Sequence, residues 1–274
     1  MTDKTRNTLG AIGLALGLVA LMLILTLTAL HSVGTDDGLY YELQTRANVL
    51  PAAGISDEDL RTLDAALARY LAGQPEALLL PLDSAPGEYS VLALKVNGEL
   101  RPAFNERELR HLDDCYRLFA LLRKVRQRLI PWAVLLILAG AQLLADRRRI
   151  RRAAWLSPLL LFVPLGAFAL WAVIDFDAAF TFFHRVLFTN DLWLLDPRTD
   201  LLIRICPASM FMSMGLRIGL WSLAAMVAVP ALAALLTAIW PKSKENGANP
   251  WNDNRTTRRA AAPKPQTFDF GGKR

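Results

Sequence analysis

The chain has 274 residues, of which 53% are hydrophobic, and its formal net charge is +6. A soluble domain averages about 45–50% apolar residues, and here the excess is concentrated in a few long runs. The sequence contains no zinc finger, RNA-binding signature or phosphate loop. We therefore assign the positive charge to contact with membrane lipids, and we expect no nucleic-acid partner.

Four runs of the sequence are apolar enough to cross a membrane as helices, since a spanning helix needs roughly 17–25 mainly apolar residues. The expected spans cover about residues 8–30, 129–145, 153–174 and 212–240. The first run is longer than the apolar part of a signal peptide, so we expect it to stay uncleaved. The sequence predicts an α-helical membrane protein with four transmembrane helices.

Positive charge near the spans predicts their orientation. The expected loop "DRRRIRR" at 146–152 contains five arginines, and short loops rich in Lys and Arg stay in the cytoplasm. Both termini of this multi-pass protein of the cell membrane are then cytoplasmic, with 31–128 and 175–211 outside. We expect residues 1–240 to form the membrane domain. The basic tail 241–274, which has little to bury, is expected to be disordered and cytoplasmic.

Local patterns in 31–128 predict a small α+β extracellular domain. Ser56 is placed to cap a helix over 55–73. Asn97-Gly98, flanked by alternating apolar residues, is the strongest short hairpin signal. Asn105 is placed to cap an amphipathic helix that continues directly into the second span.

Several residues with reactive side chains lie on this last helix or in the outer segments. His111 has Glu108 three residues before it and Asp114 three residues after it. Carboxylates at these spacings can orient an imidazole and raise its pKa, although the spacing alone favours a solvated helix face with ordinary charge pairs. Cys115 and Cys206 both fall outside, where a disulfide and two buried free thiols remain open alternatives.

Residues 175–211 are too polar for a span and too apolar for an ordinary loop. We expect an interfacial, re-entrant segment between the third and fourth spans, held at the headgroup level by its aromatic residues. Ionisable groups at this depth are costly and are candidates for function. Asp196 and Asp200 suit a turn and a helix cap, whereas His184 suits no such role. Arg217, near the outer mouth of the fourth span, is placed to reach headgroups or to hold an anionic group.

Neither a metal site nor a serine hydrolase fits the sequence. The three histidines lie far apart and form no i, i+4 pair, so we expect no metal. The G-x-S-x-G elbow of serine hydrolases is also missing from the sequence. A histidine base at the lipid boundary suits chemistry on a lipid or on a lipid-linked ester.

Two stretches, "FNERELRHLDDCYRLF" (104–119) and "FFHRVLFTNDLWLLDPRTDLLIRICP" (182–207), resemble the Lit family. These are bacterial four-span lipoprotein intramolecular transacylases, and the resemblance covers roughly residues 8–240. The second motif is specific, with a histidine followed by N-D-x-W-x-x-D-P-x-T-D. The first motif, usually E-x-x-H-x-x-D-V in this family, departs from the pattern only at Cys115.

The resemblance implies an acyltransferase that acts on diacylglyceryl-modified lipoproteins at the outer leaflet without a cofactor. It moves the sn-2 acyl chain from glycerol to the α-amine of the N-terminal cysteine, and it leaves a lyso-form lipoprotein. The family's two essential histidines match His184 and His111. We expect His184 to be the base, and His111 to orient the substrate or protonate the departing glycerol oxygen. Supporting roles are expected for eight residues, namely Glu108, Asp114, Asn190, Asp191, Trp193, Asp196, Asp200 and Arg217.

Two alternatives from other functional classes stay open. A non-catalytic membrane sensor or assembly protein predicts that His111 and His184 lie far apart. A different outer-leaflet acyltransferase or esterase, with a lipid as its substrate, predicts close histidines and a cavity open to a second substrate.

Overall fold

The computed structural model describes residues 2–81, 89–144 and 147–239, so the predicted tail 241–274 lies outside the described part. The chain divides after Ala238, and the unit before that point contains the site. Its elements are mainly helical, with two small antiparallel sheets, β1–β2 and β3–β4. The elements are, in order, α1 (Asp3–Val33), α2 (Asp37–Arg46), α3 (Leu50–Ala53), α4 (Asp57–Ala72), η1 (Pro75–Leu78), β1 (Leu79–Pro81), β2 (Tyr89–Val91), β3 (Ala93–Val96), β4 (Glu99–Pro102), α5 (Glu106–Leu143), α6 (Arg147–Leu156), α7 (Leu159–Ile174), α8 (Phe176–Leu187), α9 (Leu201–Ile205) and α10 (Ala208–Ile239).

Three helical stretches among the described residues are long and apolar enough to cross a membrane. They are Asp3–Val33, Arg147–Ile174 and Ala208–Ile239. The expected second span, 129–145, lies mostly in the last part of α5 and is not one of the three. The apolar helices of a membrane-integral protein are therefore present, and the expected second span, and with it the total of four spans, stays a prediction.

The arginine-rich stretch 146–152 is not the loop that we expected from the sequence. Its described part, from residue 147, lies in helix α6. Arginine is a good helix former, and neither glycine nor proline interrupts this stretch. The chain breaks instead at Ser157-Pro158, between α6 and α7, because proline lacks the N–H needed to continue a helix. The expected third span, 153–174, is thus divided between two helices.

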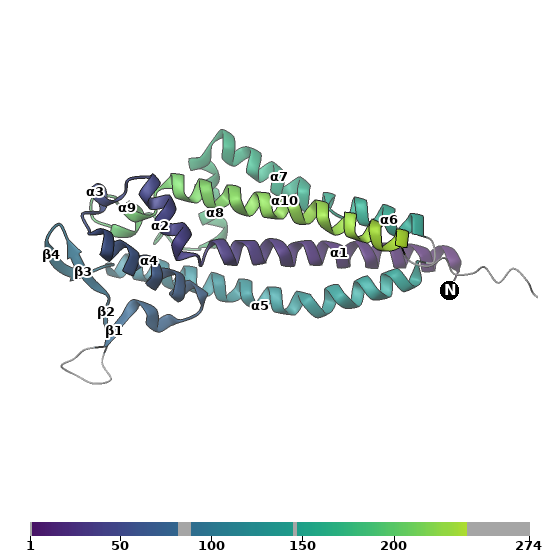
Figure 1. Ribbon diagram of the computed structural model, residues 1–274, viewed down its shortest axis with the longest axis horizontal. Coiled ribbons are helices and arrows are strands. Elements are labelled where there is room, and N and C mark those ends of the chain that lie inside the picture. Colours follow the sequence, from purple (N-terminus) through teal and green to yellow (C-terminus); the bar gives the residue numbers. More distant parts are fainter. Residues whose placement is uncertain (1, 82–88, 145–146, 240–274) are drawn as a thin grey trace, which may run out of the picture. The chain divides into compact units, whose positions relative to one another are not determined.

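Helices α1 and α5 lie side by side along their apolar parts (Figure 1). Glycines make this close approach possible. A Cβ added to Gly17 would lie 2.8 Å from the backbone nitrogen of Ile137, and one added to Gly140 would lie 2.8 Å from the Cα of Leu14. The seam therefore has no room for even one added methyl group at these positions.

The local predictions in 31–128, which is expected outside and is called the outer domain below, are confirmed. The side chain of Ser56 accepts a hydrogen bond from the backbone N–H of Asp59 at the start of α4. Asn97 and Gly98 connect β3 and β4 with φ angles of 52° and 86°, the positive values that a two-residue hairpin turn of type I′ requires. Asn105 caps α5, which runs without a break from the outer domain into its apolar part.

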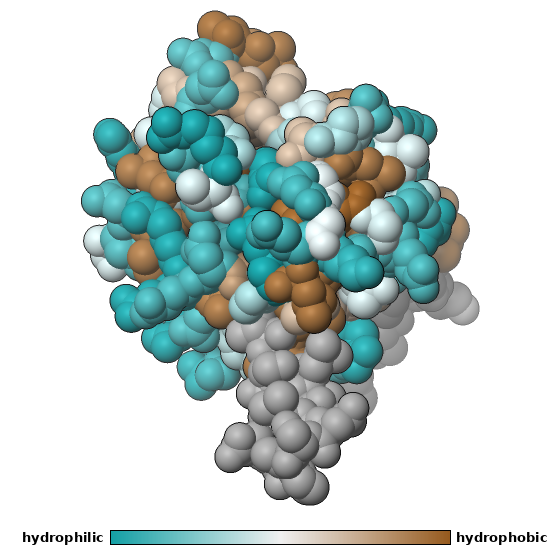
Figure 2. Space-filling view, turned by 90° about the vertical axis from the view of Figure 1, so that its left-hand side faces the viewer, coloured by the Kyte–Doolittle hydropathy of each residue, from teal (hydrophilic) through white to brown (hydrophobic). Residues whose placement is uncertain are grey.

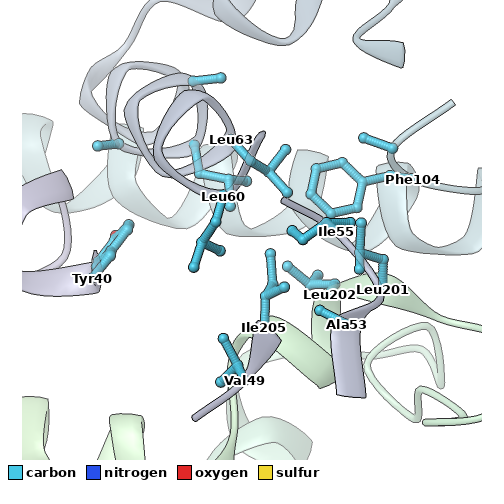
Figure 3. Packing of buried hydrophobic residues seen from close by; sticks show 14 of the residues in the cluster. Tyr40, Val49, Ala53, Ile55, Leu60, Leu63, Phe104, Leu201, Leu202 and Ile205 are labelled. Carbon is cyan, nitrogen blue, oxygen red and sulfur yellow. The ribbon is translucent and has the colours of Figure 1, made fainter. Parts of the chain in front are cut away.

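The core of the outer domain includes the short helix α9, which comes from the segment expected at the membrane interface. Leu60 and Leu63 of α4 and Phe104 cluster with Leu201 and Ile205 of α9 (Figure 3). Each of these side chains is at most 1% exposed. Part of the segment 175–211 is therefore protein core, and burial of three large apolar side chains from α9 is favourable by several kcal/mol, at about 1.5–3 kcal/mol for each full burial.

The surface changes in character between the outer domain and the apolar helices. Viewed toward α2–α4 and the strands, the surface is mainly hydrophilic, with small hydrophobic patches (Figure 2). The helices α5, α7 and α10 instead expose large apolar side chains, such as Leu138 (59%), Val173 (80%) and Trp221 (67%). This contrast suits a domain in water attached to helices in lipid.

Candidate active site

The fold brings together the two histidines that the sequence singles out. His111 lies near the start of α5 and His184 near the end of α8, and their ring centroids are 6.2 Å apart. Their side chains are only 8% and 7% exposed, respectively. A non-catalytic protein predicts that these residues lie far apart, so their proximity weighs against that alternative.

Aromatic rings surround the His184 imidazole. The ring centroids of Phe180, Trp193 and Phe188 lie 4.0, 5.0 and 5.7 Å from that of His184. Phe188 also contacts His111, at 5.2 Å with an edge-on geometry. The two imidazoles therefore share an apolar setting, in which electrostatic interactions are stronger than in water.

Both imidazoles are neutral at physiological pH. Burial lowers the pKa of His111 to about 4, and the charge of His184 adds to this effect while that of Asp114 opposes it. Burial likewise lowers the pKa of His184, against the opposing effect of its hydrogen bond to Phe180. Neutral imidazoles can each offer one lone pair and one N–H to a reaction.

The hydrogen bonding of His184 identifies its tautomer. Its Nδ1 lies 2.8 Å from the backbone carbonyl oxygen of Phe180, one helical turn earlier. A carbonyl oxygen only accepts, so Nδ1 carries the hydrogen and donates it. The lone pair of neutral His184 is then on Nε2, which is the atom able to take a proton.

The carboxylates beside His111 hold the surrounding structure, and neither hydrogen-bonds to the imidazole. Within the described residues, the buried Nδ1 of His111 has no hydrogen-bond partner. Glu108 accepts from the backbone N–H of Asn105 at 2.8 Å and of Leu202 at 2.6 Å. The spacing of three residues suggested an oriented imidazole, but the helix start and α9 engage this carboxylate instead.

Glu108 and Asp200 connect the starts of α5 and α9 reciprocally. Glu108 accepts the N–H of Leu202, a group that the first turn of α9 leaves unpaired. Asp200 occupies the cap position of α9 without a capping hydrogen bond, and it accepts instead from the side chain of Asn105 at 2.8 Å. The two sequence motifs are therefore joined through buried polar groups.

Burial affects the two carboxylates differently. Burial raises the pKa of Glu108, and the backbone hydrogen bonds from Leu202 and Asn105 only partly oppose it. Burial also raises the pKa of Asp200, but hydrogen bonds from Asp196, Thr199 and Asn105 outweigh it and leave that pKa below the usual value. Asp200 is thus an ionised acceptor in the folded protein.

Asn190 and Asp114 position the loop that covers the site. The side-chain amide of Asn190 donates to Asp114 at 2.8 Å, which fixes the loop to α5 one turn beyond His111. The indole N–H of Trp193 donates to the backbone carbonyl of Asn190 at 2.8 Å. This chain of contacts holds the Trp193 ring against His184.

Three other residues predicted to support the site, Asp191, Asp196 and Arg217, contact residues other than the two histidines. The backbone carbonyl of Asp191 accepts a hydrogen bond from Arg107, and the Asp191 side chain is exposed. Asp196 pairs with Arg198 at 2.6 Å, and this hydrogen bonding lowers the pKa of Asp196 to about 2.

Arg217 pairs with Glu42 of α2 at 3.3 Å. It therefore has a protein partner in the position where the sequence predicted contact with a headgroup or another anion. A cavity of about 350 Å³ adjoins it, lined also by Leu220, Trp221 and Ala224 of α10.

Sequence reasoning missed two aromatic neighbours of His184, Phe180 and Phe188, and the contact of Cys115 with His111. Phe180 and Phe188 stand four residues before and after His184, a spacing that places side chains on one face of a helix. Cys115 stands four residues after His111, and its Sγ lies 3.7 Å from the histidine Nε2. This periodicity was present in the sequence and could have identified all three residues.

The two cysteines are free thiols, and burial raises the pKa of both, that of Cys115 to about 12. In the described ranges, no group of three or more His, Cys, Asp or Glu side chains is arranged to hold a metal ion. The two buried imidazoles, which lie beside aromatic rings, support proton transfer as the chemistry of this site.

Solved structures of the membrane-integral lipoprotein intramolecular transacylase Lit from Bacillus cereus are similar to this chain. One has a TM-score of 0.55 and 21% identity, covering 86% of this chain and 96% of that one. A variant with one histidine replaced by arginine gives 0.56 and 20%, covering 86% and 92%. At this identity the likeness establishes a shared fold.

A comparison with curated protein sequences finds no match. The family model described as "Lipoprotein intramolecular transacylase Lit" matches residues 14–211, which is more than half of the chain and includes both histidines. The chain therefore belongs to the Lit family of lipoprotein intramolecular transacylases.

Proposed function

We propose that this enzyme moves the sn-2 acyl chain of a diacylglyceryl lipoprotein to the α-amine of the lipoprotein's N-terminal cysteine. The product is a lyso-form lipoprotein with an N-acyl chain and one remaining glyceryl ester. The observation that carries the proposal is the pair of buried, neutral imidazoles 6.2 Å apart, with Nε2 of His184 free to take a proton.

His184 activates the amine in this proposal. An α-amine has a reference pKa of about 7.7–8.0, close enough to that of imidazole for a neighbouring histidine to accept its proton. The amine nitrogen then attacks the ester carbonyl carbon. Amine and ester belong to one substrate molecule, so the enzyme gains its proximity effect by folding the two together in the pocket.

His111 acts on the ester side of the reaction. It orients the ester or protonates the departing glycerol oxygen as the C–N bond forms and the C–O bond breaks. The proton lost by the amine balances the proton gained by glycerol, so the reaction needs no cofactor and consumes no water. The aromatic wall of Phe180, Phe188 and Trp193 keeps water away from the tetrahedral intermediate.

We place the site at the outer leaflet, with four spans and both termini in the cytoplasm. The arginines of α6, next to the expected second and third spans, support this orientation under the positive-inside rule. The hydrophilic face of the outer domain supports it from the other side (Figure 2). In this arrangement residues 1–240 form the membrane domain, and 31–128 and 175–211 lie outside. Membrane lipids and lipoproteins are then the partners, and nucleic acid is not.

The activity is tested with the full-length protein in lipid vesicles and a synthetic diacylglyceryl lipopeptide with a free α-amine. An intramolecular transfer leaves the mass unchanged, so fragmentation by tandem mass spectrometry must locate the acyl chain on nitrogen. His184→Ala and His111→Ala are each expected to lower the rate by at least about 100-fold, because general acid–base catalysis typically contributes 10²–10⁴-fold.

The third histidine provides a matched control. His31 packs against Phe119 at a ring distance of 6.2 Å and belongs to neither motif. His31→Asn should therefore keep its rate, and a lipopeptide with an acetylated amine should give no product. A His184→Ala protein that inserts normally and turns over at the wild-type rate would refute the assignment.

The same assay separates the remaining alternative functions. An esterase would release free fatty acid and lower the mass of the lipopeptide. An intermolecular acyltransferase would label a second, differently tagged lipopeptide that was added to the vesicles. A non-catalytic protein would leave the lipopeptide unchanged in every arm.

The proposed orientation has its own test in whole cells. Cysteine is introduced at the exposed positions Lys95, on the hairpin strand β3, and Arg148, on α6. A membrane-impermeant thiol reagent should label Lys95→Cys in intact cells and Arg148→Cys only after lysis. Labelling of Arg148→Cys from outside would reverse the orientation.

A further inference from the structure

The two ring nitrogens of His111 have different surroundings. Nε2 lies 3.7 Å from Sγ of Cys115, which is one helical turn further along α5. Nδ1 is buried and has no hydrogen-bond partner in the part of the chain that the structure describes. A buried polar atom without a partner is unusual, and one beside a second buried histidine indicates a place for a substrate group.

The chemistry of the two side chains decides which of them donates. A thiol is a weak donor and an even poorer acceptor, whereas an imidazole nitrogen with a lone pair accepts readily. Burial raises the pKa of the Cys115 thiol to about 12, so the sulfur keeps its hydrogen. Burial also keeps the ring of His111 neutral, so only one of its nitrogens carries a hydrogen. The contact is therefore best made with the S–H donating to Nε2.

We propose that Cys115 is a positioning residue that holds His111 in the tautomer with the hydrogen on Nδ1. The free Nδ1–H is then a donor without a protein partner, ready for the carbonyl oxygen of the substrate ester. This inference rests on the proposed acyl transfer and assigns one role within it.

The arrangement makes the two histidines complementary. The carbonyl of Phe180 holds the hydrogen of His184 on Nδ1, so its Nε2 is an acceptor. Because Cys115 donates to Nε2 of His111, the hydrogen of the His111 ring is on Nδ1, which is therefore a donor. His184 takes the amine proton, the amine nitrogen bonds to the carbonyl carbon, and the Nδ1–H of His111 hydrogen-bonds to the oxyanion. The C–O bond then breaks, and His184 delivers the proton to the glycerol oxygen.

The tautomer can be measured without any turnover. Full-length protein with ¹³C,¹⁵N-labelled histidine is reconstituted in lipid bilayers, and solid-state NMR shifts of the ring atoms report which nitrogen carries the hydrogen. His111→Asn and His31→Asn samples assign the signals. We expect His111 in the Nδ1–H form in the wild type and in Cys115→Ser, which keeps a donor. Cys115→Val, which has none, should give a mixture.

Cys206 provides the matched control for the loss of a buried thiol. It is also a free cysteine, packed against the outer-domain core, and within the described ranges it makes no hydrogen bond to a site histidine. Cys206→Val should leave the His111 signals unchanged. A wild-type spectrum with the hydrogen on Nε2, or a Cys115→Val spectrum identical to the wild type, would overturn the proposal.

Kinetics separates the role in catalysis from a merely structural one. Cys115→Val should lower kcat by about tenfold with little change in KM, because it weakens an oxyanion donor, and Cys115→Ser should recover most of that loss. An unchanged kcat in Cys115→Val would show that the tautomer does not matter to the reaction. If the wild type proves inactive in the transacylase assay, the proposed function fails, while the spectra still decide the tautomer.

Discussion

The two histidines stand on helices that the protein holds in different ways. His111 belongs to α5, which packs along α1 with glycines at the contact and is fixed to α9 at its outer start. His184 belongs to α8, which follows α7, and α7 buries no residue within the described part of the chain. In α8 itself only Ala179 and His184 are buried. One imidazole thus stands on a helix that packs along α1 and is joined to α9, and the other stands beside a small aromatic cluster and one loop.

This difference predicts which substitutions change the stability of the fold and which change the rate of the reaction. Substitutions on the α5 side should destabilise the fold, because they affect buried backbone contacts. Substitutions around His184 should change the reaction more than the stability, because few contacts hold that side. Four experiments examine this contrast, in order of decreasing expected effect on stability.

Replacing Glu108 should cause the largest loss. Glu108→Ala leaves the buried backbone N–H of Leu202 without its acceptor, which costs about 1–3 kcal/mol, and it also removes the acceptor of the Asn105 N–H at the start of α5. Thermal unfolding in detergent, followed by tryptophan fluorescence, measures the change. Glu106→Ala, which removes only an exposed pair with Arg110, is the control and should unfold near the wild-type temperature. Equal unfolding temperatures for the two variants would contradict a stabilising role for the Glu108 hydrogen bonds between α5 and α9.

Filling the helix seam should have the next largest effect. A Cβ at Gly140 would collide with the backbone of Leu14, so Gly140→Ala should destabilise the protein by about 1–3 kcal/mol, as overpacking does. A Cβ added to Gly219 of α10 would meet no described atom within 4 Å, so Gly219→Ala should be neutral or slightly stabilising. Equal unfolding temperatures for Gly140→Ala and Gly219→Ala would contradict the close packing of α1 against α5 at Gly140.

The outer-domain core should give a pH-dependent stability. Burial raises the pKa of Asp64 from 3.8 to about 7, and a hydrogen bond from Gln44 at 2.9 Å only partly opposes it. Between these values the unfolded chain binds fewer protons than the folded one, so this group's contribution to stability falls as pH rises, by at most about 1.4 kcal/mol per pH unit. Above pH 7 both states are ionised and the slope ends.

Asp64→Asn isolates this dependence, because Asn can still accept from Gln44 but cannot ionise. Unfolding temperatures of this variant, measured from pH 4 to pH 8, should vary less than those of the wild type. Glu58→Gln, at an exposed position of the same helix, should keep the wild-type slope. An Asp64→Asn variant as pH-dependent as the wild type would show that Asp64 is ionised when folded.

Releasing the loop over His184 should affect stability least and turnover clearly. Asn190→Ala removes the hydrogen bond to Asp114 that holds the loop of Trp193. If the Trp193 ring moves away from His184, kcat should fall by about tenfold or more, because catalytic geometry is sensitive to shifts of an ångström. Asp191→Ala, at an exposed side chain of the same loop, is the control. A large fall in unfolding temperature for Asn190→Ala would mean that both sides of the site are held equally firmly.

Local signals in the sequence proved reliable wherever the physics is local. Ser56, Asn97-Gly98 and Asn105 act within four residues of themselves, so the cap, the turn and the start of α5 could be predicted without the rest of the fold. A loop was expected at 146–152 because this stretch lies between two apolar runs, but its described part, from residue 147, is helical, as arginine favours.

The sequence by itself determined the apolar helices, the two histidine motifs and the class of chemistry, because hydropathy and residue type are properties of the chain alone. Only the tertiary structure decided that Glu108 hydrogen-bonds to α9 and not to His111, and that the apolar side chains of α9 belong to the core. It also decided that the rings of His111 and His184 lie 6.2 Å apart. The physical reason is that a buried polar atom takes whichever partner the fold brings within reach, and residues 94 positions apart meet only when the chain has folded.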